Sequence, residues 1–209
     1  MRAVVLALLL TVPGLSLAES PRTAALATIR AFAAAGTEPI VAQMPPAATT
    51  HATVVAIVQL TPHSAAVMIA GEVQPGRYGV LVRSRPFTLS RETNFGAWIE
   101  EFQFKAPDRI ELSFTSRNGC ARSLVTHKFV LRSERWLVAG LDTLTMRCTD
   151  NAVERDWTES ANYLTGKIVR TTFPTSKPAK ATELRTDRKP FPLSEFPPNG
   201  PEAAYAELQ

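Results

Sequence analysis

Two cysteines flank a segment that reads as two strands joined at residues 133–135, and this symmetry constrains the fold more than any other feature. Cys120 and Cys148 are equidistant from Glu134, so a turn there places them opposite each other at the open end of the hairpin. The register predicts three facing pairs: Phe129 with Ala139, Leu131 with Leu137, and His127 with Leu141. It also places six apolar residues on one face of the sheet, as a half-buried hairpin requires: Val125, Phe129, Leu131, Leu137, Ala139 and Leu141.

The same symmetry predicts a disulfide between Cys120 and Cys148, provided that the chain folds in an oxidising compartment. Closing a loop of this length stabilises a fold by roughly 3–4 kcal/mol in the chain-entropy model. The alternative is a pair of free, buried thiols. The turn lacks the glycine or asparagine that short hairpin loops favour.

Residues 1–18 have the pattern of a secretory signal peptide. Arg2 precedes an apolar run over residues 3–12, and small residues at Ser16 and Ala18 favour cleavage after Ala18. The run is well short of the roughly 20 residues that span a bilayer as a helix. We therefore expect a periplasmic or secreted protein with no transmembrane segment after cleavage; the alternative is a retained membrane anchor.

The positive charge of the chain is concentrated near its C-terminal end. The formal net charge is +4, and residues 167–191 contain seven basic and two acidic residues. Seven of the 16 prolines lie between Pro174 and Pro201. Since proline interrupts both helices and central strands, we expect residues 174–209 to form a basic, proline-rich, extended tail that lies along the sheet or lacks regular structure.

Residues 19–173 are expected to form a single β-rich domain. Ser20 and Pro21 favour the start of a helix over residues 21–35 with one apolar face. Strand patterns follow at residues 53–60, 65–73, 77–83, 98–104 and 109–115, with turns at 74–76 and 106–108. Such meanders are typical of antiparallel sheets. The predicted fold class is mainly β (α+β): a curved antiparallel sheet or a two-layer β domain of about seven to nine strands with one N-terminal helix.

Patterns for common catalytic and metal sites are missing from the sequence. Gly166-Lys167 lacks the preceding glycine and the following hydroxyl residue of a phosphate-binding loop. The three histidines, His51, His63 and His127, are isolated in sequence, and we expect structural roles for them. The acidic residues between 150 and 156 do not have the spacing of a calcium loop. We predict no cofactor and no metal.

Three segments resemble parts of a group of uncharacterised exported bacterial proteins with degenerate FG-GAP or VCBS-like β repeats. These segments are Thr126–Phe129, Trp136–Asp142, and the Asn-x-Leu-Thr-Gly-Lys segment at Asn162–Lys167. Residues 54–87, with the turn at Gly76, are similar to the repeats themselves. The resemblance covers about half of the chain and implies a β architecture and export, but no particular activity. The calcium-binding Asp-x-Asp-x-Asp-Gly loop of true FG-GAP repeats is absent.

Tyr163, Thr165, Lys167 and His127 are the candidate binding residues, although turn chemistry alone explains the residue types around Gly166. We expect a non-catalytic, exported interaction or envelope-associated protein whose partner is an unknown protein or envelope component rather than nucleic acid. One alternative is a periplasmic hydrolase with a site assembled from separated strands, using His127, Asp142 and Glu100. The other is a binder of anionic surfaces that acts through its basic tail.

Overall fold

The computed structural model describes residues 20–42, 52–88, 95–149, 152–175 and 177–197. It begins with a helix, α1 (Pro21–Arg30), whose cap is Ser20: the Ser20 Oγ accepts the Thr23 N–H at 3.2 Å. The helix is shorter than the predicted range 21–35. Its continuation is replaced by a bond to the sheet, because the Ala34 N–H donates to the Gln59 carbonyl at 2.7 Å.

A small antiparallel sheet follows, with the strand order β1 (Ile40–Val41), β2 (Ala52–Thr61), β3 (Ser64–Gln74), β4 (Arg77–Arg83). β5 (Phe87–Thr88) pairs with β3 beyond the end of β4. The predicted turn between β3 and β4 is confirmed: Gly76 has φ +74°, in the left-handed region that glycine enters without steric cost.

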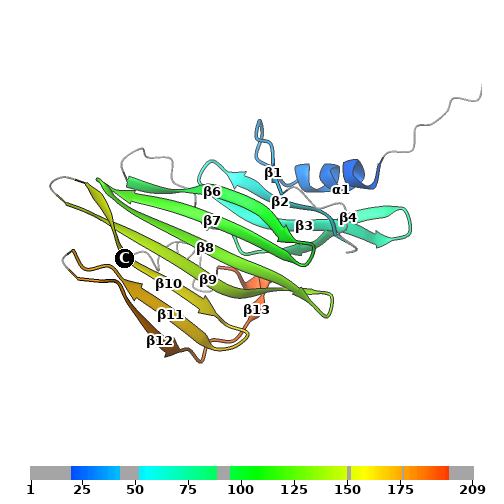
Figure 1. Ribbon diagram of the computed structural model, residues 1–209. Helices are drawn as coiled ribbons and strands as arrows, with labels where there is room; N and C mark the ends of the chain where they lie inside the picture. The colour runs from blue at the N-terminus through cyan, green and yellow to red at the C-terminus, as the bar shows by residue number, and fades with distance from the viewer. Residues whose placement is uncertain (1–19, 43–51, 89–94, 150–151, 176, 198–209) are drawn as a thin grey trace, which may run out of the picture.

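A larger antiparallel sheet contains seven consecutive strands in chain order (Figure 1). These are β6 (Phe95–Ala106), β7 (Arg109–Asn118), β8 (Ala121–Arg132), β9 (Arg135–Cys148), β10 (Val153–Asn162), β11 (Lys167–Thr172) and β12 (Lys180–Arg185). The chain then turns back, and β13 (Phe191–Pro192) pairs with β9 beyond the end of β10. A single 3-10 turn, η1 (Leu193–Glu195), follows.

The two sheets pack face to face, and the helix covers the other face of the small sheet (Figure 1). Ala25 and Ile29 of α1 are fully buried against small-sheet residues such as Val54 and Met68. Because the small sheet is covered on both sides, β2 and β3 are almost continuously apolar. The predicted fold class, a mainly β antiparallel domain with one N-terminal helix, is confirmed, and of the two predicted arrangements the structure has the two-layer one. The predicted seven to nine strands are too few, because the described residues form 13.

The disulfide between Cys120 and Cys148 is confirmed, with their Cα atoms 5.9 Å apart. Near it the predicted register holds, and His127 faces Leu141. Toward the turn the other two predicted pairs are wrong: Phe129 faces Val138 and Leu131 faces Trp136.

The register changes because the turn has two residues rather than three. Ser133 and Glu134 both have positive φ, 45° and 63°, as a type I′ turn requires. A β-bulge at Ala139 absorbs the difference of one residue. As a result, Trp136 and Val138 lie in the main core, in place of Leu137 and Ala139.

The tail also contributes to this core. Leu193 is 1% exposed and Phe196 is fully buried. The Phe196 ring centroid lies 5.3 Å from that of Phe129 and 6.1 Å from that of Phe87, so it touches rings of both sheets. The segment after β12 therefore runs across the inner face of the large sheet and places Phe196 between the two sheets.

Candidate functional site

A groove of about 360 Å³ lies on the inner face of the large sheet. Its strands β10 and β11 lie on the side of the large sheet away from the small sheet (Figure 1). We call it the inner groove. Its lining comes from β9, β10, β11 and the segment after β12: Leu141, Thr143, Trp157, Glu159, Ala161, Tyr163, Ile168, Arg170, Thr186 and Arg188.

The strand register arranges the floor of the inner groove in rows across the sheet. One row is apolar: Leu141, Ala161 and Ile168. The next row on the same face is polar: Thr143, Glu159 and Arg170. Side chains two positions apart on a strand share a face, so the alternation along β10 and β11 creates both rows.

An arginine–glutamate pair and an aromatic ring form one side of the inner groove. Arg170 donates from Nε and Nη2 to Glu159 Oε2, at 2.8 Å and 2.5 Å. Its guanidinium lies 5.5 Å from the centroid of the Trp157 ring, within cation–π range. These contacts hold the planar guanidinium in place over the floor.

The segment after β12 forms the opposite end. The Arg188 Nη1 donates to the Tyr163 hydroxyl at 3.2 Å. The same guanidinium lies 5.3 Å from the Tyr163 ring centroid and 5.7 Å from that of Phe191. Two arginines against one glutamate give the groove lining a formal charge of +1.

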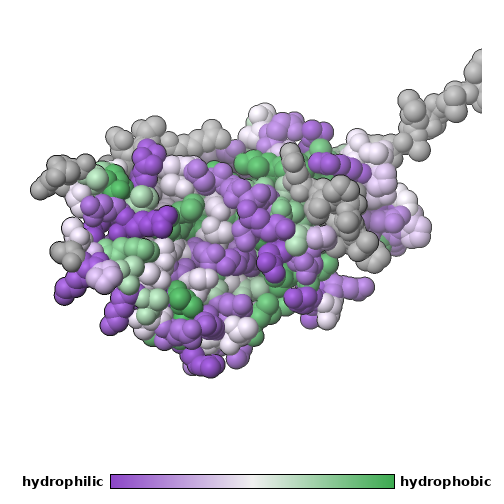
Figure 2. Space-filling view, viewed as in Figure 1, coloured by the Kyte–Doolittle hydropathy of each residue, from purple (hydrophilic) through white to green (hydrophobic). Residues whose placement is uncertain are grey.

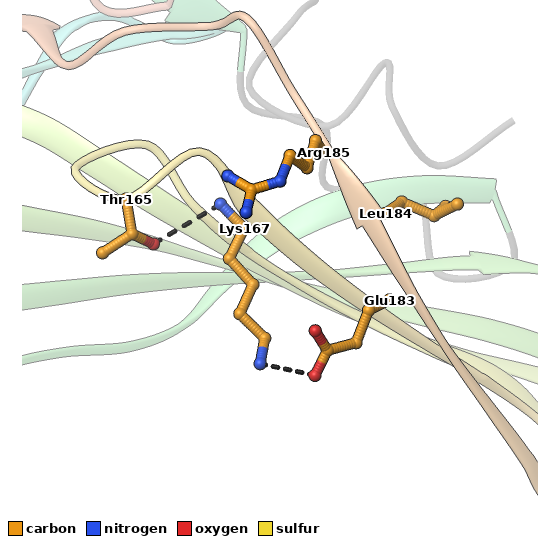
Figure 3. Close-up of a pocket in the computed structure, with 5 residues that line it drawn as sticks. All are labelled: Thr165, Lys167, Glu183, Leu184 and Arg185. Carbon is orange, nitrogen blue, oxygen red and sulfur yellow. Dashed lines mark hydrogen bonds and ion pairs between the residues drawn. The ribbon is translucent and has the colours of Figure 1, made fainter.

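A second hollow, of about 320 Å³, lies at the corner formed by β11 and β12 (Figure 3). It is lined by Thr165, Lys167, Glu183, Leu184 and Arg185. Lys167 Nζ and Glu183 Oε1 form an ion pair at 2.6 Å across it. We call it the edge hollow.

The turn before the edge hollow is held by hydrogen bonds to Asn162 and by the backbone conformation of Gly166. Asn162 Oδ1 accepts the N–H groups of Leu164 and Thr165 at 3.0 Å and 3.2 Å. Gly166 has φ +68°, and its carbonyl accepts the Thr186 N–H at 3.0 Å. The Asn-x-Leu-Thr-Gly-Lys segment thus has a clear structural role.

The four candidate binding residues lie in three separate places. Tyr163 lines the inner groove, whereas Thr165 and Lys167 line the edge hollow. His127 is only 6% exposed and packs in the core, with its ring centroid 4.8 Å from that of Phe196.

Sequence reasoning missed Trp157, Arg170 and Arg188 as groove residues. The first two alternate with outward residues on β10 and β11, and a parity analysis of these strands would have found them. No strand alternation marks Arg188, because it lies after β12. Only the path of the chain beyond that strand brings it to Tyr163.

The residues named for a hydrolase do not meet. His127 faces the core, whereas Asp142 lies on the other face of the sheet and binds Lys128 Nζ at 2.6 Å. This agrees with their predicted opposite parities. Glu100 is exposed and accepts the Trp98 Nε1–H at 3.2 Å. Among the described residues, no group of three or more His, Cys, Asp or Glu side chains is arranged to hold a metal ion.

Comparison of the chain with family models, curated proteins and solved structures returned no match. Within the described ranges, no helix is both long and apolar enough to cross a membrane. The face shown in Figure 2 mixes hydrophilic and hydrophobic residues, with hydrophilic ones predominating.

Proposed function

We propose that this chain is an exported, non-catalytic binding protein whose ligand site is the inner groove. The observation that carries this proposal is the combination of size and chemistry: about 360 Å³, an apolar row along the floor, and two arginines held against aromatic rings. The volume lies within the range of roughly 300–1,000 Å³ that small-molecule sites occupy.

The groove chemistry favours an amphiphilic anion, such as an acyl chain that ends in a carboxylate. An envelope component can have this chemistry. The apolar row crosses three strands at about 4.8 Å spacing, which gives a path of roughly 10 Å for an apolar chain. Each methylene buried there contributes about 0.8 kcal/mol. Arg188, which flanks this row beside Tyr163, offers the planar donors that match a carboxylate.

Export is supported by the leader-like pattern of residues 1–18, which lie outside the described residues, and by the disulfide. A bond between Cys120 and Cys148 is what an oxidising compartment favours. Both cysteines are exposed, so the bond would be accessible to cytosolic reductants.

The basic tail gives weaker support to an anionic-surface binder. The basic stretch 167–191 begins in β11, and two of its seven basic residues already pair with carboxylates: Lys167 with Glu183 and Arg170 with Glu159. Surface binding needs such charges to be available together on one face.

Calorimetric titration of the purified protein with dodecanoate tests the proposal, with dodecanol as a probe of equal length but without charge. We expect dodecanoate to bind and Arg188→Gln to weaken binding about tenfold, because a charge-assisted hydrogen bond contributes about 1.5–3 kcal/mol. Lys189→Gln, an exposed neighbour, is the matched control and should leave the affinity unchanged. Absence of dodecanoate binding, or equal weakening by both substitutions, would contradict the proposal.

A further inference from the structure

β12 is an edge strand of the large sheet. Among the described strands it pairs only with β11, and all six of its side chains are exposed. An edge strand exposes main-chain donors and acceptors to which another strand can bind.

One hydrogen bond shows which residues of β12 direct their main-chain groups away from β11. The Thr186 N–H donates to the Gly166 carbonyl, and this pair continues the register in which Lys167 faces Arg185. In an antiparallel ladder, hydrogen-bonded and non-hydrogen-bonded pairs alternate. Leu184 and Thr182 therefore bond to β11, whereas the odd-numbered residues 181, 183 and 185 direct their N–H and C=O groups away from it.

The side chains of β12 are self-complementary in one register. If two copies pair antiparallel about Leu184, Glu183 of each copy faces Arg185 of the other, and these are the residues with outward main-chain groups. Opposite charges at directly facing positions are stabilising. The neighbouring register about Glu183 places two carboxylates opposite each other, which is destabilising.

The surface around β12 has room for this contact. Glu183 and Arg185 lie on one side of the strand and Leu184 on the other (Figure 3). All three line the edge hollow, and Leu184 is 42% exposed although it is apolar. In the register about Leu184, the two leucines face each other and cover part of this apolar surface.

We propose that two copies of this chain associate through β12, in the antiparallel register centred on Leu184, so that their eight-stranded sheets become continuous. Pro178 and Pro190 flank the strand and limit the pairing to a short segment. The area is small, so the dimer is weak and depends on concentration. This association is independent of the inner-groove proposal.

Sedimentation velocity over a range of protein concentrations tests the dimer. We expect the unmodified protein to shift from monomer to dimer as its concentration rises. Glu183→Arg gives two arginines at the facing positions, and Arg185→Glu gives two glutamates, so each variant alone should remain monomeric.

Mixing the two variants provides the decisive measurement. In the mixture each arginine pair faces a glutamate pair, and we expect a heterodimer to form. Lys177→Glu, an exposed charge change before β12, is the control and should leave association unchanged. A circular dichroism melt of each variant checks that it is folded.

Three results would overturn the proposal: a monomer at every concentration, a dimer that persists in both single variants, or a mixture of the variants that stays monomeric.

Discussion

Phe196 provides the strongest test of whether the segment after β12 belongs to the core. Its side chain is fully buried, and its ring lies 4.8–6.1 Å, between centroids, from His127, Phe129 and Phe87. A buried phenylalanine removes about 200 Å² of surface from water, which stabilises the fold by roughly 5 kcal/mol at about 25 cal/mol per Å². Phe→Ala substitutions in cores lower the free energy of unfolding by about 3–5 kcal/mol. We expect Phe196→Ala to lower the free energy of unfolding by about 4 kcal/mol.

Urea denaturation followed by far-UV circular dichroism measures this loss as a lower midpoint with an unchanged slope. For a chain of this size the melting temperature should fall by roughly 8–16 °C. Ser194→Ala, at an exposed position two residues earlier, is the control and should change stability by less than about 0.5 kcal/mol. A loss below about 1 kcal/mol for Phe196→Ala would refute the packing of this segment between the sheets.

Three further predictions concern the β8–β9 hairpin and its neighbour β10. Replacing both cysteines with alanine removes a bond with a sequence separation of 28 residues and should cost about 3.5 kcal/mol in urea denaturation; a loss under 1 kcal/mol would contradict the entropic argument. Gly140→Ala should cost about 1–3 kcal/mol by the same assay, because its Cβ would lie 2.5 Å from the Ala161 carbonyl oxygen; unchanged stability would mean that β10 does not approach so closely. The pair Ser133→Asn with Glu134→Gly should raise stability by about 1 kcal/mol, since both positions have positive φ; a lower melting temperature would argue against a type I′ turn.

The β8–β9 hairpin contains features that the local sequence pattern predicted and one that it did not. The cysteine symmetry predicted the disulfide and the pairing of His127 with Leu141, because both depend only on the total length of the loop. It did not predict the bulge at Ala139, because a two-residue turn with a bulge and a three-residue turn give the same pairing at the open end. The two kinds of turn differ only in which residues of β9 face the core, and in the structure these are Trp136 and Val138.

The candidate site divides in the same way. Asn162 and Gly166 have turn chemistry that is local, and the structure builds the turn from these residues. The inner groove depends on side chains from strands that are distant in sequence, and on a tail that was expected only to lie along the sheet or to lack regular structure. The approach of Arg188 to Tyr163 follows from the path of the chain after β12.

By itself the sequence determined the class of structure, namely antiparallel strands, one capped helix and one cystine, because alternation, capping and loop length act over a few neighbouring residues. Tertiary structure alone decided which strands lie away from the small sheet, which aromatic ring of the tail fills the space between the layers, and where a groove remains open. Those outcomes depend on the packing of surfaces far apart in the chain, and packing has no local signature.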